Sequence, residues 1–415
     1  MVLGTDEFLP LARAQSAAHG LPGLPVVTVP HPIGGIAAAA AAAKADPVMA
    51  SVMSGLTSQP EAATARASAR GVDIHEAPAD LDEFQGWLME RGWGDGLPVI
   101  PPTRERVAMM LGGARRKPDE VVAVLVPRLG RATVEAIAAN AVLAGALPEH
   151  MPVILAALEA LADPSFNLQA IQTTTHPCSP LLIVNGPIAR RLGINAAGNV
   201  FGQGARANAA IGRAVRLTLQ NVGGARPGKE DRATHGHPGK YAYCVAENEA
   251  ASPWEALSIE RGFSPVDSTV TVCGSEAPHN INDHGTTTPE GIVMTVAGTA
   301  STTGSNNVYL GGEPLVALGP EHASTAASTG WTKDDFKRAV WEAARVPLER
   351  FTAENIERFA GIYPEGFNNR PAGAVARIAR DWRDLMVIVT GGAGKHSAFI
   401  PTFGATRSVT RKITA

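Results

Sequence analysis

A cysteine and a histidine lie two residues apart in the polar segment Thr173-Thr-Thr-His-Pro-Cys-Ser-Pro180, directly before an apolar run. A thiol becomes a nucleophile at neutral pH when a nearby base or positive charge lowers its pKa. Pro177 favours an extended backbone, in which residues i and i+2 point to the same side. We therefore predict that Cys178 is a nucleophile or redox centre with His176 as its base. The alternative for Cys178 is a buried small residue at a strand start, the commoner fate of cysteine.

A glycine-rich segment, Phe201-Gly-Gln-Gly-Ala-Arg-Ala-Asn208, precedes a predicted helix. It fits the GxGxxA pattern of dinucleotide-binding loops, but a strand should end just before it and none is predicted there. Free backbone N–H groups at the helix start, together with Arg206, could instead hold a carboxylate or phosphate. The alternative is that the glycines only let the helix approach the sheet closely.

A second glycine-rich segment, Gly391-Gly-Ala-Gly-Lys-His-Ser397, follows a predicted strand. It departs from the phosphate-binding loop of nucleotide hydrolases because His396 separates the lysine from the serine. Loops after buried strands commonly carry active sites, and a lysine there can anchor an anion, act as a base or form an imine. We predict that Lys395 and His396 belong to the site; the alternative for Lys395 is an ordinary solvated side chain.

Histidine and aspartate side chains gather in Glu276-Ala-Pro-His-Asn-Ile-Asn-Asp-His284 and in His235-Gly-His237. These side chains could bind zinc or ferrous iron, but their spacing matches no recognised metal signature. We therefore assign no metal ligand and expect substrate binding, with a metal-dependent enzyme built on His279, Asp283 and His284 as the alternative.

The candidate site residues come from these segments and from the loop after Ala300, where Asn and Gly are also ordinary turn formers. The predicted catalytic residues are Cys178, His176, Lys395 and His396. The predicted substrate-binding residues are Thr174, Thr175, Asn199, Gln203, Arg206, Asn208, His279, Asp283, His284, Asn306 and Asn307.

The composition is that of a globular protein, with 415 residues, 45% of them hydrophobic and 18% charged. A net charge of −3 and the lack of a basic stripe argue against a nucleic-acid partner. Three cysteines without a CxxC pair suit a reducing compartment. The longest apolar stretch is interrupted by Pro148-Glu-His150, and the N-terminus does not read as a signal peptide. We expect a cytoplasmic protein that does not span a membrane.

The apolar patterns predict an α/β or α+β fold with a mixed sheet flanked by helices and without a fixed-period repeat. Three parts are expected: a partial α/β unit over 1–45, a linker over 46–78 and a main domain over 79–415. The predicted strands are 25–30, 121–126, 181–184, 241–246, 269–273, 315–318 and 385–389. The principal predicted helices are 9–19, 35–44, 131–143, 151–161, 205–220, 289–300 and 333–344.

Two N-terminal segments resemble a known family. Asp6-Glu-Phe-Leu-Pro-Leu-Ala-Arg13 and Pro25-Val-Val-Thr-Val-Pro-His-Pro32 resemble the latter half of the UGSC domain of bacterial selenoproteins and their cysteine homologues. The region that accompanies that domain resembles Gly94–Thr103, Thr175–Cys178, Gly319–His322 and Gly391–Ser397. The U/C-Gly-Ser-Cys motif that names the family is not in this sequence, so its redox role is carried over to no residue.

Taken together, these features favour an enzyme or enzyme subunit that acts on a small polar or anionic molecule by thiol-dependent redox or carbon–heteroatom bond chemistry. An oxidoreductase or a lyase is expected, as a homo- or hetero-oligomer and with no cofactor assigned. The alternative from another class is a non-catalytic subunit that completes a partner, such as a small redox subunit bearing the CGSC-type motif.

Overall fold

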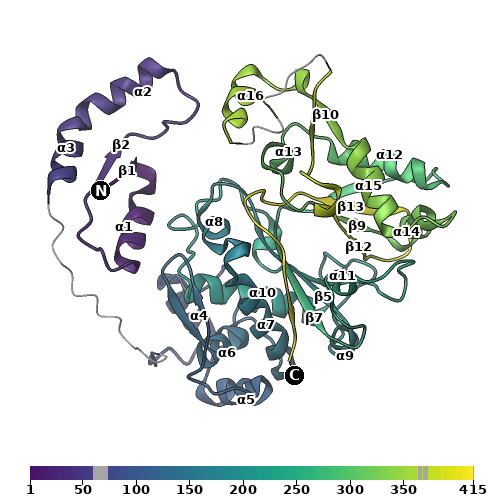
Figure 1. The fold of residues 1–415 in the computed structure, drawn as a ribbon. Helices are drawn as coiled ribbons and strands as arrows, with labels where there is room; N and C mark the ends of the chain where they lie inside the picture. The colour runs from purple at the N-terminus through teal and green to yellow at the C-terminus, as the bar shows by residue number, and fades with distance from the viewer. Residues whose placement is uncertain (59–72, 363–366, 368–372, 415) are drawn as a thin grey trace.

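The main body is built on two four-stranded mixed sheets that pack face to face (Figure 1). The computed structural model describes residues 1–58, 73–362, 367 and 373–414. The first sheet has the order β6 (Cys244–Ala246), β5 (Ser179–Asn185), β7 (Thr269–Ser275) and β14 (Val409–Lys412). The second has the order β12 (Met386–Val389), β9 (Leu315–Leu318), β13 (His396–Ile400) and β8 (His279–Asn282). The predicted α/β class is confirmed, and the expected single sheet is divided in two.

Side-chain alternation along the strands creates a layered core. Leu181 and Ile183 of β5 pack with Leu315 and Ala317 of β9 in the cluster between the two sheets. The alternate residues of each sheet, such as Leu182 of β5, face a helical layer instead. The body is therefore a four-layer sandwich of helices, sheet, sheet and helices.

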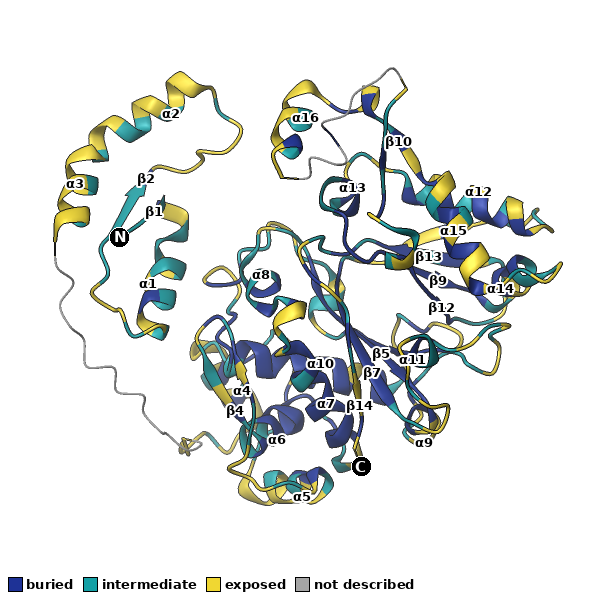
Figure 2. Cartoon of the chain, in the orientation of Figure 1, coloured by how far each residue is buried: buried dark blue, intermediate teal, exposed yellow. Residues whose placement is uncertain are grey.

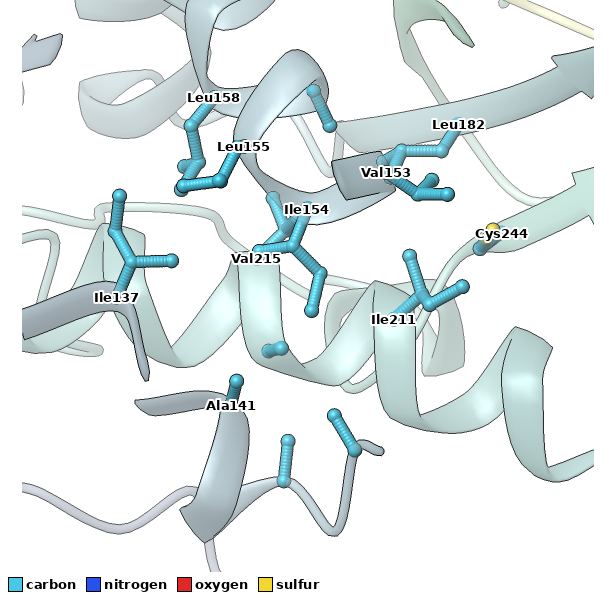
Figure 3. Packing of buried hydrophobic residues seen from close by; sticks show 14 of the residues in the cluster. Ile137, Ala141, Val153, Ile154, Leu155, Leu158, Leu182, Ile211, Val215 and Cys244 are labelled. Carbon is cyan, nitrogen blue, oxygen red and sulfur yellow. The ribbon is translucent and has the colours of Figure 1, made fainter. Parts of the chain in front are cut away.

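The central helices over the first sheet are mostly buried, whereas the outer ones of this layer are largely exposed (Figure 2). In α7 (Met151–Leu161) every residue except Glu159 is buried, as expected of a helix that is apolar on all sides. Figure 3 shows Ile154 of α7 between α6 and α10. The other helices of this layer are α4 (Leu81–Glu90), α5 (Arg104–Ala114), α6 (Val134–Leu143), α8 (Leu168–Thr173) and α10 (Arg206–Asn221).

The second helical layer covers the outer face of the second sheet. Its members are α12 (Pro289–Ala300), α13 (Asn306–Leu310), α14 (Pro320–Ala327), α15 (Lys333–Ala343) and α16 (Ala353–Ala360). Smaller elements complete the body: the pair β3 (Val121–Leu125) and β4 (Gly130–Thr133), the pair β10 (Arg345–Pro347) and β11 (Val375–Arg377), and the short helices α9 (Pro187–Arg191) and α11 (Leu257–Glu260).

The two halves of the body repeat one topology. The connection after β5 contains α9 and α10, and the connection after β9 contains α14, α15 and, beyond β10, α16. Each of the two strands has a later parallel neighbour (β6 or β12) and then an antiparallel one (β7 or β13). The chain then changes sheet, because β7 continues into β8 of the second sheet and β13 continues into β14 of the first. The sequence pattern predicted no repeat, but the halves share a topology and exchange their last strands.

This exchange gives the sandwich two different ends. At the crossing end, where β7 and β13 leave their sheets, Ser275 forms a β-bridge with Thr402, and the N–H of Glu276 donates to the carbonyl oxygen of Pro401 at 2.8 Å. The open end holds the carboxyl ends of β5, β6, β9 and β12, where the N–H of Asn248 donates to the carbonyl oxygen of Val389 at 2.7 Å.

The N-terminal unit consists of β1 (Val2–Thr5), α1 (Leu9–Ala18), β2 (Val26–Val29), α2 (Ala38–Ala45) and α3 (Met49–Thr57), with β1 parallel to β2. It contacts the body through Arg232, whose guanidinium pairs with Glu7 at 2.7 Å and lies 5.4 Å from the ring centre of Phe8. The predicted helix over 9–19 and strand over 25–30 are confirmed. The part of the predicted linker over 59–72 lies outside the described residues.

Two predicted elements differ from the structure. The run from Val121, predicted as a buried strand, forms the separate β3–β4 pair, and Val124 is half exposed. Arg131, the predicted start of a helix, lies in β4, and the helix begins at Val134 after the N-cap residue Thr133. None of the described helices is both long and apolar enough to cross a membrane.

Candidate active site

A cavity of about 410 Å³ opens at the crossing end, between the β7–β8 connection and the end of α12. Its apolar wall includes Pro177, Pro278, Phe399 and Pro401. Its polar lining residues are His237, Glu276, His279, Thr299, Thr302 and Ser305. A mostly apolar pocket with a few converging polar groups is typical of a site for a small molecule.

The central polar feature of this cavity is a histidine–carboxylate pair. Nε2 of His176 lies 2.7 Å from Oε1 of Glu276, and the two side chains are 13% and 26% exposed. The Glu276 backbone is fixed on both sides, since its N–H donates to Pro401 and its carbonyl oxygen accepts from the Tyr243 hydroxyl at 3.0 Å. The pair is thus rigid and open to the cavity on the glutamate side.

Among the buried polar atoms at this end that have no hydrogen-bond partner within the described residues are Nδ1 of His176, Oγ of Ser275 and Oγ of Ser305. Ser305 is 4% exposed and lines the cavity. Buried polar atoms usually find a partner, so the unpartnered hydroxyl of Ser305 is suited to a ligand in the cavity.

His237, which the sequence pattern marked as metal-competent, forms a wall of the cavity. Its Nδ1 accepts from the N–H of Gly239 at 3.1 Å, and its Nε2 lies 3.2 Å from the carbonyl oxygen of Ser275. Because both ring nitrogens are used, the ring is held as the neutral Nε2–H tautomer, and burial lowers the pKa of His237.

Cys178 is buried beside this site, next to the lining residue Pro177, and does not line the cavity itself. Its side chain is only 1% exposed, and burial raises the pKa of its thiol to about 12, although Lys240 acts in the opposite direction. The N–H of Cys178 donates to the carbonyl oxygen of His176 at 2.9 Å, which closes a tight turn. The expected extended backbone is therefore not formed, and the His176 ring faces Glu276 instead of the thiol.

The two threonines predicted to position substrate shape this turn. Oγ1 of Thr174 accepts from the N–H of His176 at 3.0 Å, and the carbonyl oxygen of Thr175 accepts from the N–H of Thr234 at 2.9 Å. Both interactions hold the segment that carries His176, and neither threonine lines the cavity.

An ion-pair network that the sequence analysis missed supports the same segment. Asp231 pairs with Arg216 of α10 at 2.7 Å and with Lys240 at 2.8 Å, and Arg216 also donates to Gln172 at 3.1 Å. Burial raises the pKa of Asp231, but the two cations outweigh it and hold that pKa low. These residues are far apart along the chain, so no local pattern could reveal them.

The side chains of Asn306 and Asn307, which follow α12, hold the segment after β13 in place by hydrogen bonds. The side chain of Asn307 accepts from the N–H of Thr402 at 2.7 Å and donates to its hydroxyl at 2.9 Å. Oδ1 of Asn306 accepts from the N–H of Gly404 at 2.8 Å. Their hydrogen bonds give both a structural role, where the sequence predicted substrate binding.

Four predicted residues meet at the open end instead. Nε2 of His284 lies 3.4 Å from Nε2 of His396, and Nζ of Lys395 donates to the carbonyl oxygen of His284 at 3.2 Å. Asp283 is already occupied, because it accepts from the N–H of Thr286 and from the hydroxyl of Thr295 at 2.6 Å. Burial raises the pKa of Asp283, but these hydrogen bonds outweigh it and lower that pKa to about 2.

His279 is separated from this group. It lies at the start of β8 and lines the cavity, whereas Asp283 and His284 follow the other end of β8. The three side chains of the metal-dependent alternative therefore do not converge. Within the described residues, no group of three or more His, Cys, Asp or Glu side chains could hold a metal ion.

The second glycine-rich segment contacts the loop that precedes the first one, since the N–H of Gly391 donates to the carbonyl oxygen of Ala196 at 2.9 Å. Asn208 is buried and donates to the carbonyl oxygen of Cys244 at 3.0 Å, which makes it structural. Arg206 donates to the carbonyl oxygen of Gly145 at 3.0 Å.

The turn before α10 is closed by its own side chains. Asn199 adopts a left-handed conformation with φ of 58°, and its Nδ2 donates to the carbonyl oxygen of Gln203 at 2.8 Å. Asparagine is one of the few residues that tolerate this conformation. Asn199 and Gln203 thus stabilise the loop itself.

Comparison with known proteins bears on the N-terminal unit. No curated protein matches the chain. The model of the UGSC family matches residues 1–58, which cover β1 to α3 and lie outside both groups of polar residues described above. The resemblance predicted from Asp6–Arg13 and Pro25–Pro32 is therefore confirmed as a similarity of residues 1–58 to the UGSC family.

Proposed function

We propose that this protein is an enzyme that transfers a proton to and from a small polar molecule bound in the cavity at the crossing end. The observation that carries the proposal is the Glu276–His176 pair, in which a carboxylate that lines the cavity is held at 2.7 Å by an imidazole behind it. A positioned carboxylate within reach of a substrate proton is a usual general base.

In this mechanism Glu276 takes a proton from the substrate and later returns it. His176 is a positioning residue, because its Nε2–H holds Oε1 of Glu276 and leaves the second oxygen for the substrate. The Ser305 hydroxyl would donate to a substrate oxygen on which negative charge develops.

Proton removal next to an electron-withdrawing group leads to isomerisation, or to elimination and addition of a heteroatom group. Neither outcome needs an external oxidant or reductant, since the electrons stay within the substrate. Of the reaction classes expected from the sequence, this mechanism favours carbon–heteroatom chemistry of the lyase type.

Thiol chemistry by Cys178 would require a different conformation. A nucleophilic thiol must be exposed and deprotonated, whereas Cys178 is 1% exposed and its pKa is about 12. The Glu276 carboxylate, in contrast, lines the cavity.

The proposal is tested by incubating the protein in D₂O with defined sets of small hydroxy acids, amino acids and sugar acids. Mass spectrometry then detects deuterium incorporation or a new product. Glu276→Gln should reduce the rate at least a hundredfold, because general bases contribute about 10²–10⁴-fold. Cys178→Ser and the exposed control Glu290→Gln should keep the wild-type rate. An active Glu276→Gln variant combined with an inactive Cys178→Ser variant would instead establish the thiol mechanism.

A further inference from the structure

We propose that His284 and His396 form a binding site for a transition-metal ion at the open end, separate from the cavity. Their Nε2 atoms are 3.4 Å apart and their rings are nearly perpendicular, at 81°. Zinc–nitrogen distances of about 2.0–2.1 Å with tetrahedral angles place two coordinating nitrogens roughly 3.4 Å apart. The spacing of these two atoms therefore matches one edge of a zinc coordination tetrahedron.

The hydrogen bonding of His396 gives its ring the tautomer that a metal requires. Nδ1 of His396 lies 3.0 Å from Oδ1 of Asn280 and donates to it, so the lone pair of Nε2 points toward His284. Metal-binding histidines usually carry such a partner on the second ring nitrogen, which fixes the ring and raises its basicity.

The backbone that carries this arrangement is a rigid part of the second sheet. His396 begins β13 and pairs with Asn282 of β8, and Asn280 lies two residues along β8 on the same face. His284 follows β8 by two residues. Two strands hydrogen-bonded to each other thus hold the ligand candidates and the orienting amide.

A direct hydrogen bond between His284 and His396 explains their spacing less well than a metal ion bound between them. The distance of 3.4 Å exceeds the usual 2.7–3.2 Å range for N–H donors. Both histidines are exposed, so the ion has an entry path from solvent. Imidazole nitrogen suits Zn²⁺, Ni²⁺ and Cu²⁺.

The remaining coordination positions would be taken by water or an anion. Asp283 does not complete the set, since its oxygens accept from Thr286 and Thr295. The ammonium group of Lys395, on the same loop as His396, would attract an anionic ligand to the bound ion.

The test is titration of the metal-free full chain with Zn²⁺ by calorimetry, and with Cu²⁺ by electron paramagnetic resonance to count coordinating nitrogens. We expect one Zn²⁺ per chain and two imidazole nitrogens on Cu²⁺. His284→Ala or His396→Ala should weaken binding at least tenfold, and Asn280→Ala should weaken it about tenfold, as loss of an outer partner does. His235→Ala, at an exposed histidine elsewhere, should bind like wild type.

Absence of stoichiometric Zn²⁺ binding, or unchanged binding by the variant that lacks both His284 and His396, would overturn the site. Glu276→Gln must leave metal binding unchanged, because it alters the cavity at the crossing end. The metal site and the proposed proton transfer can therefore fail independently.

Discussion

Each end of the sandwich combines equivalent elements of the two halves, but the polar groups of the two ends differ in their hydrogen-bond partners and in their access to solvent. At the crossing end the exchanged strands border a cavity that is open to solvent, and an unpartnered hydroxyl and a rigid carboxylate line it. At the open end the imidazoles and the ammonium group reach solvent, and Asp283 accepts hydrogen bonds from its neighbours. The cavity at the crossing end suits a small molecule, and the exposed imidazoles at the open end suit a hydrated ion.

Two other polar groups near the open end are buried. Glu247, directly after β6, accepts from the side chain of Asn185 and from the N–H of Leu257, and burial raises the pKa of its carboxyl. After β9, the buried His322 bonds to Ser397 at 2.7 Å. Glu247 and His322 are 4% and 1% exposed, whereas His284 and His396 on the β8 side of this end are exposed to solvent.

The largest expected difference between the ends concerns thiol reactivity. With a pKa of about 12 and 1% exposure, Cys178 should react with iodoacetamide at pH 8 on the order of a thousandfold more slowly than an exposed cysteine of ordinary pKa. The matched control is Ala251→Cys, which introduces a thiol at an exposed position beyond β6 at the open end. Peptide mass spectrometry measures both rates in the folded protein. Rates within tenfold of each other would restore Cys178 as a candidate nucleophile.

Two equivalent glycines provide the next comparison, because Gly186 follows β5 and Gly319 follows β9. A Cβ at either position would overlap a backbone oxygen, that of Asp267 or that of His396. Only Gly186 also has a positive φ, with φ of 85° and ψ of −171°, in a region that glycine alone adopts readily.

Gly186→Ala should therefore lower the free energy of unfolding by about 4 kcal/mol and Gly319→Ala by about 2 kcal/mol, from overpacking with and without backbone strain. Urea unfolding measures both values. Gly298→Ala is the control, since an alanine there would contact none of the described residues and should stabilise α12 by up to about 1 kcal/mol. Equal losses of unfolding free energy in Gly186→Ala and Gly319→Ala would show that an added Cβ destabilises the two halves equally.

The sequence predicted several central elements because their patterns are local, but it missed β13, an inner strand of the second sheet. Helix α12 was predicted with the bounds that the structure has, and the apolar runs located β5, β9 and β12. The strands β8 and β14 were missed because each lies at a sheet edge and buries few side chains. Their exchange between the sheets depends on contacts far apart in the chain, which periodicity does not record.

The candidate site was predicted in part, for a similar reason. His176 was identified, but its partner Glu276 lies a hundred residues away, in a segment that stood out only for its histidines. The proposed Cys178 pairing rested on an extended backbone, and the hydrogen bond from Cys178 to His176 turns the chain instead. His284 and His396 were both chosen, but only the β8–β13 register showed that they face each other.

The smallest expected difference between the two ends concerns their ion pairs. At the crossing end Asp231 is 7% exposed between Arg216 and Lys240, whereas near the open end Glu260 is 24% exposed between Lys333 and Lys337. Asp231→Asn should cost about 3 kcal/mol, because it removes the buried carboxylate that Arg216 and Lys240 share. Glu260→Gln should cost about 2 kcal/mol, because water reaches the carboxylate although Lys333 and Lys337 are only 6% and 3% exposed.

The dependence on pH gives this prediction its sign. The folded-state pKa of Asp231 lies below its value in the unfolded chain, so its stabilisation is complete above about pH 4. That stabilisation is lost as the pH falls through the lowered pKa, where the folded protein must also take up the proton. The difference in unfolding free energy between wild type and Asp231→Asn should therefore be constant from pH 8 to pH 5 and shrink below pH 4. Urea unfolding across this range measures it, and a difference that grows on acidification would mean that the network does not stabilise the charged form of Asp231.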